Sequence, residues 1–109
     1  MERAVLVYTT YPSIVEAEQA GRALVERRLC ACVNIHPGMI SYYWWQGSVD
    51  RGAEVTMIAK TRASLSEKVR AAIRARHSYT TPAILVIPLE SVDPDYQAWI
   101  ISETENADV

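Results

Sequence analysis

Side chains that could bind a soft metal ion occur at two places in this chain. Cys30, Cys32 and His36 lie close together, and His77 follows much later. Thiolate and imidazole groups suit Cu(I) and Zn(II), and the first three residues would share one face of an extended strand, whose side-chain period is two residues. Free cysteine is also among the most buried residue types. The pattern therefore allows two interpretations, a metal site or two thiols buried in the core, and it favours the second.

His77 stands beside Tyr79 and follows two arginines, Arg74 and Arg76. Such a group at the end of a helix could form a pocket for a metal ion or a small anion. Cations at this place also stabilise a helix simply by complementing its dipole, and the two interpretations are about equally supported. Any pocket is expected between subunits, near His77 and Tyr79, because clefts between chains let side chains converge.

Four large aromatic residues stand in a row, in a chain that contains no phenylalanine: Tyr42, Tyr43, Trp44 and Trp45. In a strand, Tyr42 and Trp44 would point to one face and the other two to the opposite face. A single-layer sheet has only one core face to cover such rings, each of which buries about 150–250 Å². We therefore expect another copy of the chain to cover the second face. Stacking on nucleic-acid bases is the alternative.

Composition predicts one soluble domain, residues 1–109. Half of the 109 residues are hydrophobic, there are two cysteines, and the formal net charge is −2. The charge disfavours nucleic-acid binding, no apolar run reaches the ~18 residues of a membrane span, and the cysteine usage agrees with a reducing, cytoplasmic compartment. The four glycines are scattered and form no phosphate loop, and no nucleophile has an identifiable base. We predict a protein that is not an enzyme.

Hydrophobic periodicity predicts alternating strands and helices. A capping box formed by Ser13 and Glu16 starts the first helix, and Ser64 with Glu67 starts the second. Asp93 and Pro94 start a third helix, which carries Trp99. The predicted strands are residues 3–10, a long strand over 31–45 that Pro37-Gly38 bends or bulges, residues 55–61 after a turn over 46–54, and residues 82–90.

The resulting order is βαββαβ with an extra C-terminal helix, which is an α+β, ferredoxin-like fold with an antiparallel sheet. Helices cover one face of such a sheet and leave the other open. A closed ring of identical chains would cover the open faces and pair the strand edges of the long hairpin.

Four segments of the chain resemble, in order, the CutA family of divalent-cation tolerance proteins. They are "ERRLCACVNIHPGMISYYWWQGSV", "KTRASL", "HSYTTP" and "PDYQAWI". The resemblance implies a homotrimer similar to the PII signal proteins, a response to metal ions, and no catalytic activity. It also implies copper binding in some members, through a Cys just after the first strand and a His pair. Thr9, Arg76 and His77 stand at those positions here, so only His77 remains as a copper ligand.

These observations together predict a trimeric divalent-cation tolerance protein that binds copper, another divalent metal or a small effector. The expected metal ligands are His77 and Cys32. The residues expected at the trimer interface or pocket are Tyr42, Tyr43, Trp44, Trp45, Tyr79 and Trp99. A small enzyme with its site between subunits and a ferredoxin-like nucleic-acid-binding domain are the alternatives; nucleic acid and membrane are not expected as partners.

Overall fold

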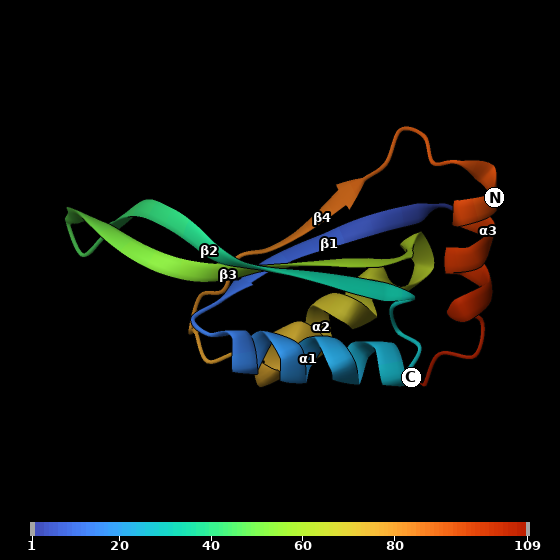
Figure 1. Cartoon of the computed structure of the whole chain (residues 1–109), viewed down its shortest axis with the longest axis horizontal. Coiled ribbons are helices and arrows are strands. Elements are labelled where there is room, and N and C mark those ends of the chain that lie inside the picture. Colours follow the sequence, from blue (N-terminus) through green and yellow to red (C-terminus); the bar gives the residue numbers. More distant parts are fainter. Residues whose placement is uncertain (1, 109) are drawn as a thin grey trace.

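The computed structural model describes residues 2–108 as an antiparallel sheet with two helices on one face and a third helix at one end (Figure 1). The elements are β1 (Ala4–Tyr11), α1 (Ile14–Glu26), β2 (Cys32–Trp45), β3 (Ser48–Arg62), a 3-10 turn (Ala63–Leu65), α2 (Ser66–Arg76), β4 (Ile84–Pro88) and α3 (Pro94–Glu103). The strand order is β2-β3-β1-β4. The predicted α+β fold with its extra C-terminal helix is confirmed.

The core lies between the sheet and the helices α1 and α2. Alternate residues of β1 and β3, such as Val7 and Met57, are fully buried there, because successive side chains of a strand point to opposite faces. The helices contribute small and branched side chains such as Ala17, Leu24 and Ile73. The remaining alternate residues of β1 and β3 face away from α1 and α2, on a second face of the sheet that is here called the open face. Among the described residues, the third helix contacts this face only at the end that carries Ala4, Lys60 and Arg62.

The β2–β3 hairpin is longer than the rest of the sheet. Strand β1 pairs with β3 only as far as Tyr11 opposite Val55, whereas β2 and β3 stay paired to their ends, with Trp45 opposite Ser48. The segment 39–54 therefore projects beyond the sheet, as Figure 1 shows. This hairpin overhang makes the molecule elongated, with a radius of gyration of 14.5 Å against about 13 Å for a compact domain of this length.

The turn at the end of the hairpin is shorter than predicted. Only Gln46 and Gly47 form it, with φ angles of 49° and 85°, the two positive values that a tight type I′ hairpin turn requires. The prediction of a turn over residues 46–54 is wrong, because Ser48–Glu54 continue as strand. The predicted bulge at Pro37-Gly38 is confirmed by a register shift between His36 and Met39.

Of the two predicted capping boxes, the first is half confirmed and the second is wrong. Ser13 Oγ accepts a hydrogen bond from the backbone N–H of Glu16 at 3.2 Å, but the Glu16 carboxylate does not return the bond and instead binds Ser78. The second capping box is absent from the described chain, because a 3-10 turn occupies Ala63–Leu65 and α2 begins only at Ser66. Ser64 there donates to Glu2.

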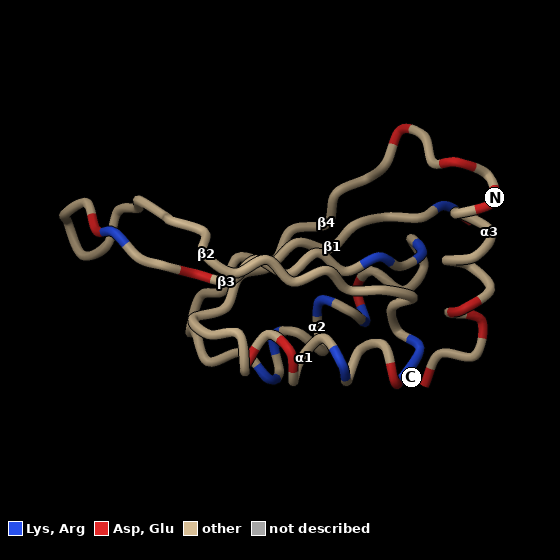
Figure 2. Tube along the Cα trace, in the orientation of Figure 1, with Lys and Arg blue, Asp and Glu red and all other residues tan. Residues whose placement is uncertain are grey.

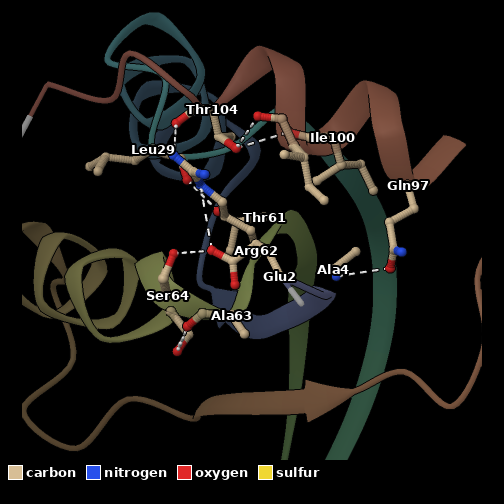
Figure 3. Close-up of polar contacts among 12 residues, drawn as sticks. Glu2, Ala4, Leu29, Thr61, Arg62, Ala63, Ser64, Gln97, Ile100 and Thr104 are labelled. Atoms are coloured by element: carbon tan, nitrogen blue, oxygen red, sulfur yellow. Dashed lines mark hydrogen bonds and ion pairs between the residues drawn. The ribbon is translucent and has the colours of Figure 1, made fainter.

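Helix α3 begins at Pro94, preceded by Asp93 as predicted, and polar contacts attach it to the sheet (Figure 3). Gln97 Oε1 accepts a hydrogen bond from the backbone N–H of Ala4 at 3.2 Å. Arg62 donates to the carbonyl of Thr104 at 2.9 Å. These contacts hold α3 at the end of the molecule that lies opposite the hairpin overhang (Figure 1).

Charged residues are concentrated outside the sheet (Figure 2). Strands β1, β2 and β4 contain no Lys, Arg, Asp or Glu, and β3 contains five. Within residues 2–108, no helix is long and apolar enough to cross a membrane.

Candidate functional site

A cavity of about 580 Å³ lies between the hairpin overhang, the end of β1 and the loop that joins α2 to β4. Its lining residues are Thr10, Tyr43, Trp45, Glu54, Ser78, Tyr79, Thr80, Thr81 and Ala83. The volume is in the range of small-molecule sites, about 300–1,000 Å³. The loop supplies Tyr79 and the hairpin supplies two of its four aromatic rings; the location of a pocket between subunits stays a prediction.

Among the described residues, Glu54 is the only charged one that lines the cavity. Hydroxyl groups surround its carboxylate. Ser41 Oγ donates to Oε1 at 2.7 Å. Thr10 Oγ1 and Tyr79 OH both donate to Oε2 at 3.1 Å. Among residues 2–108, Glu54 makes no ion pair. The negative charge of this carboxylate is therefore stabilised by hydrogen bonds from uncharged hydroxyl groups and is not balanced by a positive side chain.

The hydroxyl of Tyr79 is a fixed donor to this carboxylate. Burial first, and then the hydrogen bond to Glu54 and its negative charge, raise the pKa of Tyr79 to about 12. A hydroxyl with so high a pKa stays protonated at neutral pH, so it donates to Glu54 throughout the physiological range. It is correspondingly a poor general acid, because an effective one has a pKa near the working pH.

His77 lies beside the cavity and joins two segments of the chain. Its Nε2 is 2.7 Å from the carbonyl oxygen of Thr10, and its Nδ1 accepts a hydrogen bond from the backbone N–H of Tyr79 at 3.1 Å. This pairing requires the neutral tautomer with the proton on Nε2. The ring stacks on Tyr11, with 4.5 Å between centroids, and its side chain is fully buried. Both ring nitrogens are thus occupied by the backbone.

Glu16 anchors the same loop from helix α1. One carboxylate oxygen accepts the backbone N–H of Ser78 at 3.0 Å and the other accepts its hydroxyl at 2.7 Å. The loop is therefore attached at three consecutive residues, Ser78 to Glu16, His77 to Thr10 and Tyr79 to Glu54. The cavity wall formed by the loop is held in place without a ligand.

The four adjacent rings of the hairpin divide as the sequence predicted. Tyr43 and Trp45 line the cavity. Tyr42 and Trp44 point to the other side of the hairpin, where they are 70% and 75% exposed. The pairing of Tyr42 with Arg51 and of Trp44 with Val49 confirms that all four are strand residues.

Of the group predicted around residues 30–36, only Cys32 and His36 lie on one strand face, four residue steps apart. Cys30 lies before β2 and is buried, and burial raises the pKa of its thiol to about 12. Cys32 is half-buried opposite Lys60, and His36 is exposed at the bulge. The stronger expectation, that Cys30 is a core side chain, is confirmed.

Cys32 and His77, the two predicted metal ligands, lie apart. Cys32 is level with Leu6 across the sheet, because both pair with Lys60, whereas His77 contacts Thr10. These levels are four residue steps apart along β1, which corresponds to about 13 Å. Within residues 2–108, no three His, Cys, Asp or Glu side chains are grouped to hold a metal ion. One chain alone therefore does not fit copper at these residues.

Thr9 and Arg76, the positions implied by the resemblance, provide no metal ligand. Thr9 lies inside β1 and is fully buried, and its hydroxyl has no hydrogen-bond partner among the described residues. Arg76 ends helix α2. Trp99 lies far from the cavity, on α3, where it stacks with Tyr96. Tyr96 accepts a hydrogen bond from Lys60 on the open face at 3.0 Å.

The sequence prediction missed Glu54 and its donors Thr10 and Ser41. These residues lie on three different strands and meet only through the register of the sheet. Thr10 pairs with Thr56 and Ser41 with Gly52, and each of these partners is two residues from Glu54 on β3. The signal that could have indicated Glu54 is an acidic residue within a strand whose neighbours on the same face are Thr56 and Ile58.

Chemically, the groups that line the site are suited to binding a ligand. A carboxylate, several hydroxyls and three aromatic rings surround a preformed space. No thiol lines the cavity, and the nearest imidazole, that of His77, has both nitrogens engaged.

The family match and the most similar proteins point to the same family. Residues 5–103 match the family described as "CutA1 divalent ion tolerance protein". The chain is 42% identical over 99 residues to the divalent-cation tolerance protein CutA of Archaeoglobus fulgidus, covering 91% of this chain and 96% of the relative. It is 39% identical over 104 residues to the CutA of Thermus thermophilus, covering 95% and 99%.

Solved structures agree with this relationship. The fold is similar to that of the periplasmic divalent cation tolerance protein CutA from Archaeoglobus fulgidus, with a TM-score of 0.88, 40% identity, and 95% of this chain and 99% of that chain covered. It is also similar to CutA1 from Oryza sativa, with a TM-score of 0.90, 33% identity, and 94% of each chain covered. The family match, the sequence identity and the shared fold all extend over nearly the whole chain, and the chain therefore belongs to the CutA1 divalent ion tolerance protein family.

Proposed function

We propose that this protein is a homotrimeric binding module that acts in the cellular response to divalent metal ions, in the cytoplasm and without catalysis. The names of its relatives, divalent-cation tolerance proteins, support the metal response. Two free cysteines support a reducing compartment. The names of the family and its relatives describe ion tolerance and no reaction, which supports a role without catalysis.

The observation that carries the proposal of a trimer is the uncovered open face of the sheet. Leu85 and Ile87 of β4 lie on this face and are 54% and 39% exposed. They pair with Tyr8 and Leu6 of the uncharged strand β1, so the apolar surface is continuous across both strands. Monomeric proteins seldom expose such surface without a partner.

The hairpin overhang adds a second uncovered apolar surface, on the side of the hairpin opposite to the open face. Its outward rings, Tyr42 and Trp44, are the most exposed large hydrophobic side chains among the described residues. A closed ring of identical chains covers both the open faces and the strand edges of the overhang, because each copy presents the same surfaces in rotation. Three copies are the number that the family resemblance supports.

Metal binding is assigned here to the assembled trimer. One chain does not bring Cys32 and His77 together, and His77 is engaged by the backbone. Cys32 lies on the open face, next to Lys60, where another copy can approach. A thiolate there is suited to a soft ion such as Cu(I).

Native mass spectrometry over a range of protein concentrations tests the assembly, and calorimetric titration of the metal-stripped protein with Cu(I) and Cu(II) tests the metal. We expect a trimer at all concentrations and copper binding that Cys32→Ala removes. Cys30→Ala is the matched control, because that thiol is buried in the core. A monomer in dilute buffer would refute the trimer; copper binding unaffected by Cys32→Ala would refute the assigned ligand.

A further inference from the structure

We propose that the cavity under the hairpin overhang binds a small organic ammonium ion, with Glu54 as its counter-charge and the rings of Tyr43, Trp45 and Tyr79 as its walls. This ligand is distinct from the metal ion of the proposed function. The cavity is lined by residues of one chain and lies on the side of the open face, so the inference requires that the neighbouring copy of the proposed trimer leave the cavity accessible.

The carboxylate of Glu54 is the first argument. A carboxylate has about four lone-pair sites, and Ser41, Thr10 and Tyr79 occupy three of them. Oε1 accepts a single bond, from Ser41 at 2.7 Å, and so retains an acceptor site for a ligand N–H. No cationic side chain lines the cavity. A charge-assisted hydrogen bond from an ammonium group would satisfy both the remaining lone pair and the uncompensated charge.

The aromatic walls are the second argument. Tyr43 and Trp45 line the cavity and remain 42% and 53% exposed, and Tyr79 adds a third ring from the loop. The face of an aromatic ring attracts a cation within about 6 Å of its centre, by about 0.5 to 2 kcal/mol as the site becomes drier. Aromatic faces around a carboxylate favour an organic cation, which combines a charge with apolar surface.

The same residues disfavour a bare metal ion and an anion. Ca²⁺ takes 6–8 oxygen ligands that include several carboxylates, and Mg²⁺ requires octahedral geometry. Here a single carboxylate is accompanied by hydroxyls that donate to it rather than facing the cavity as ligands. An anion would meet Glu54 without any compensating positive side chain in the lining.

Hydrogen bonds within the chain also hold the wall of the cavity in place. The loop that carries Tyr79 is bonded to Glu16 on α1 and, through His77, to Thr10 on β1. Because the binding groups are already ordered, little free energy is lost in ordering them when a ligand binds. Its volume of about 580 Å³ accommodates an ammonium group together with a ring or chain.

Benzylammonium is a suitable probe, since it joins one ammonium to one ring. Calorimetric titration gives its affinity, and the indole N–H signals of the tryptophans in a ¹⁵N correlation spectrum locate it. Benzyl alcohol and benzoate are the neutral and anionic analogues, and Mg²⁺ and Zn²⁺ are tested alone. The variants are Glu54→Gln and Trp45→Ala. Trp44→Ala is the matched control, because this neighbouring ring points away from the cavity.

We expect saturable binding of benzylammonium, with benzyl alcohol weaker by at least about tenfold, which is the factor that 1.4 kcal/mol of ion pairing and cation–π attraction provides. Glu54→Gln and Trp45→Ala should each weaken binding by at least about fivefold to tenfold, whereas Trp44→Ala should leave it unchanged. The Trp45 signal should shift on titration. Because Trp45→Ala leaves the hydroxyl network of Glu54 intact, it tests the site even where Glu54→Gln alters folding.

Several results would overturn the inference: equal affinity for benzyl alcohol, equal losses from Trp44→Ala and Trp45→Ala, or displacement of benzylammonium by Zn²⁺ in a manner that depends on Glu54. A Trp45 signal that is shielded by another copy and does not respond to the probe would also overturn it. The mass of the assembly and its copper affinity, measured separately, show whether the proposed function fails independently.

Discussion

The strongest test of the site architecture is His77→Ala. The structure makes this imidazole a connection between β1 and the cavity loop, through the carbonyl of Thr10 and the N–H of Tyr79. Its ring also stacks on Tyr11. We expect the variant to lower the free energy of unfolding substantially, because alanine leaves both backbone groups without their partner and a gap beside the stacked ring.

The magnitude follows from these contacts. Each hydrogen bond contributes about 1 kcal/mol net, and more where a buried group is left unpaired. The stacked pair contributes about 0.5–1.5 kcal/mol, and removal of a large buried side chain adds a cavity cost. Because the His77 side chain is fully buried, water cannot replace the lost contacts. We expect a total loss of about 3 to 5 kcal/mol.

Guanidinium denaturation followed by tryptophan fluorescence measures this loss. Protein concentration must be equal for all variants, since the unfolding of an oligomer depends on it. His36→Ala is the matched control: the same residue type lies exposed at the bulge, where a substitution usually changes stability by no more than about 0.5 kcal/mol. If His77→Ala unfolds like His36→Ala and loses copper affinity instead, His77 is a metal ligand and the structural role is wrong.

Three further predictions concern the core and the open face. Gly21→Ala should lower the free energy of unfolding by about 1 kcal/mol in denaturant titrations. Its new Cβ would lie 2.8 Å from Val33 Cγ2, and this overpacking outweighs the gain in helix propensity. Glu18→Ala, at an exposed position of the same helix, should leave the free energy of unfolding nearly unchanged. Burial raises the pKa of the Cys30 thiol from 9.0 to about 12, so this thiol loses its proton at lower pH in the unfolded chain than in the folded one. The free energy of unfolding should therefore fall as pH rises from about 9 to 12. Cys30→Ala should make that fall less steep. Leu85→Lys should lower the mass of the assembly in native mass spectrometry, since it places a charge on the exposed apolar face; an unchanged mass would place the interface elsewhere.

Local patterns predicted most of the fold because they depend on near neighbours. The alternation of β1 and β3 and the Pro94 start of α3 are visible in the sequence and hold in the structure. The capping box at Ser64 failed because a 3-10 turn, set by packing, precedes α2. Likewise, both carboxylate oxygens of Glu16 bind Ser78, a residue distant in sequence that supplies a backbone and a side-chain donor.

The candidate site was harder to predict because its donors come from separate segments. Tyr79 and the hairpin rings were predicted at a pocket, and the structure places Tyr43, Trp45 and Tyr79 around one cavity. Glu54, its only charged residue, was missed, since its three hydroxyl partners lie 44, 13 and 25 residues away in the sequence. His77 was predicted as a ligand because its residue type suits metals. Its partners are a carbonyl and an N–H of the backbone, and no residue type in the sequence indicates such contacts.

The bulge in β2 decides which rings of the hairpin face the cavity. Before it, the even-numbered residue His36 is paired with Thr56 on the open face; after it, the odd-numbered Met39 is paired with Glu54 on the same face. Three steps along β2 therefore match two along β3, and one extra residue inverts the side-chain parity. Gly38, with a φ of 84°, adopts a backbone conformation that other residues rarely allow.

This inversion divides the aromatic row between two roles. With the extra residue, Tyr43 and Trp45 lie on the side of Glu54 and line the cavity, and Trp44 faces outward. Without it, Trp44 would stand on the side of the carboxylate. A strand with rings on both faces can serve a ligand with one pair and another copy of the chain with the other, and the position of the bulge makes that assignment. The Pro37-Gly38 dipeptide is thus as much a determinant of the binding site as the rings themselves.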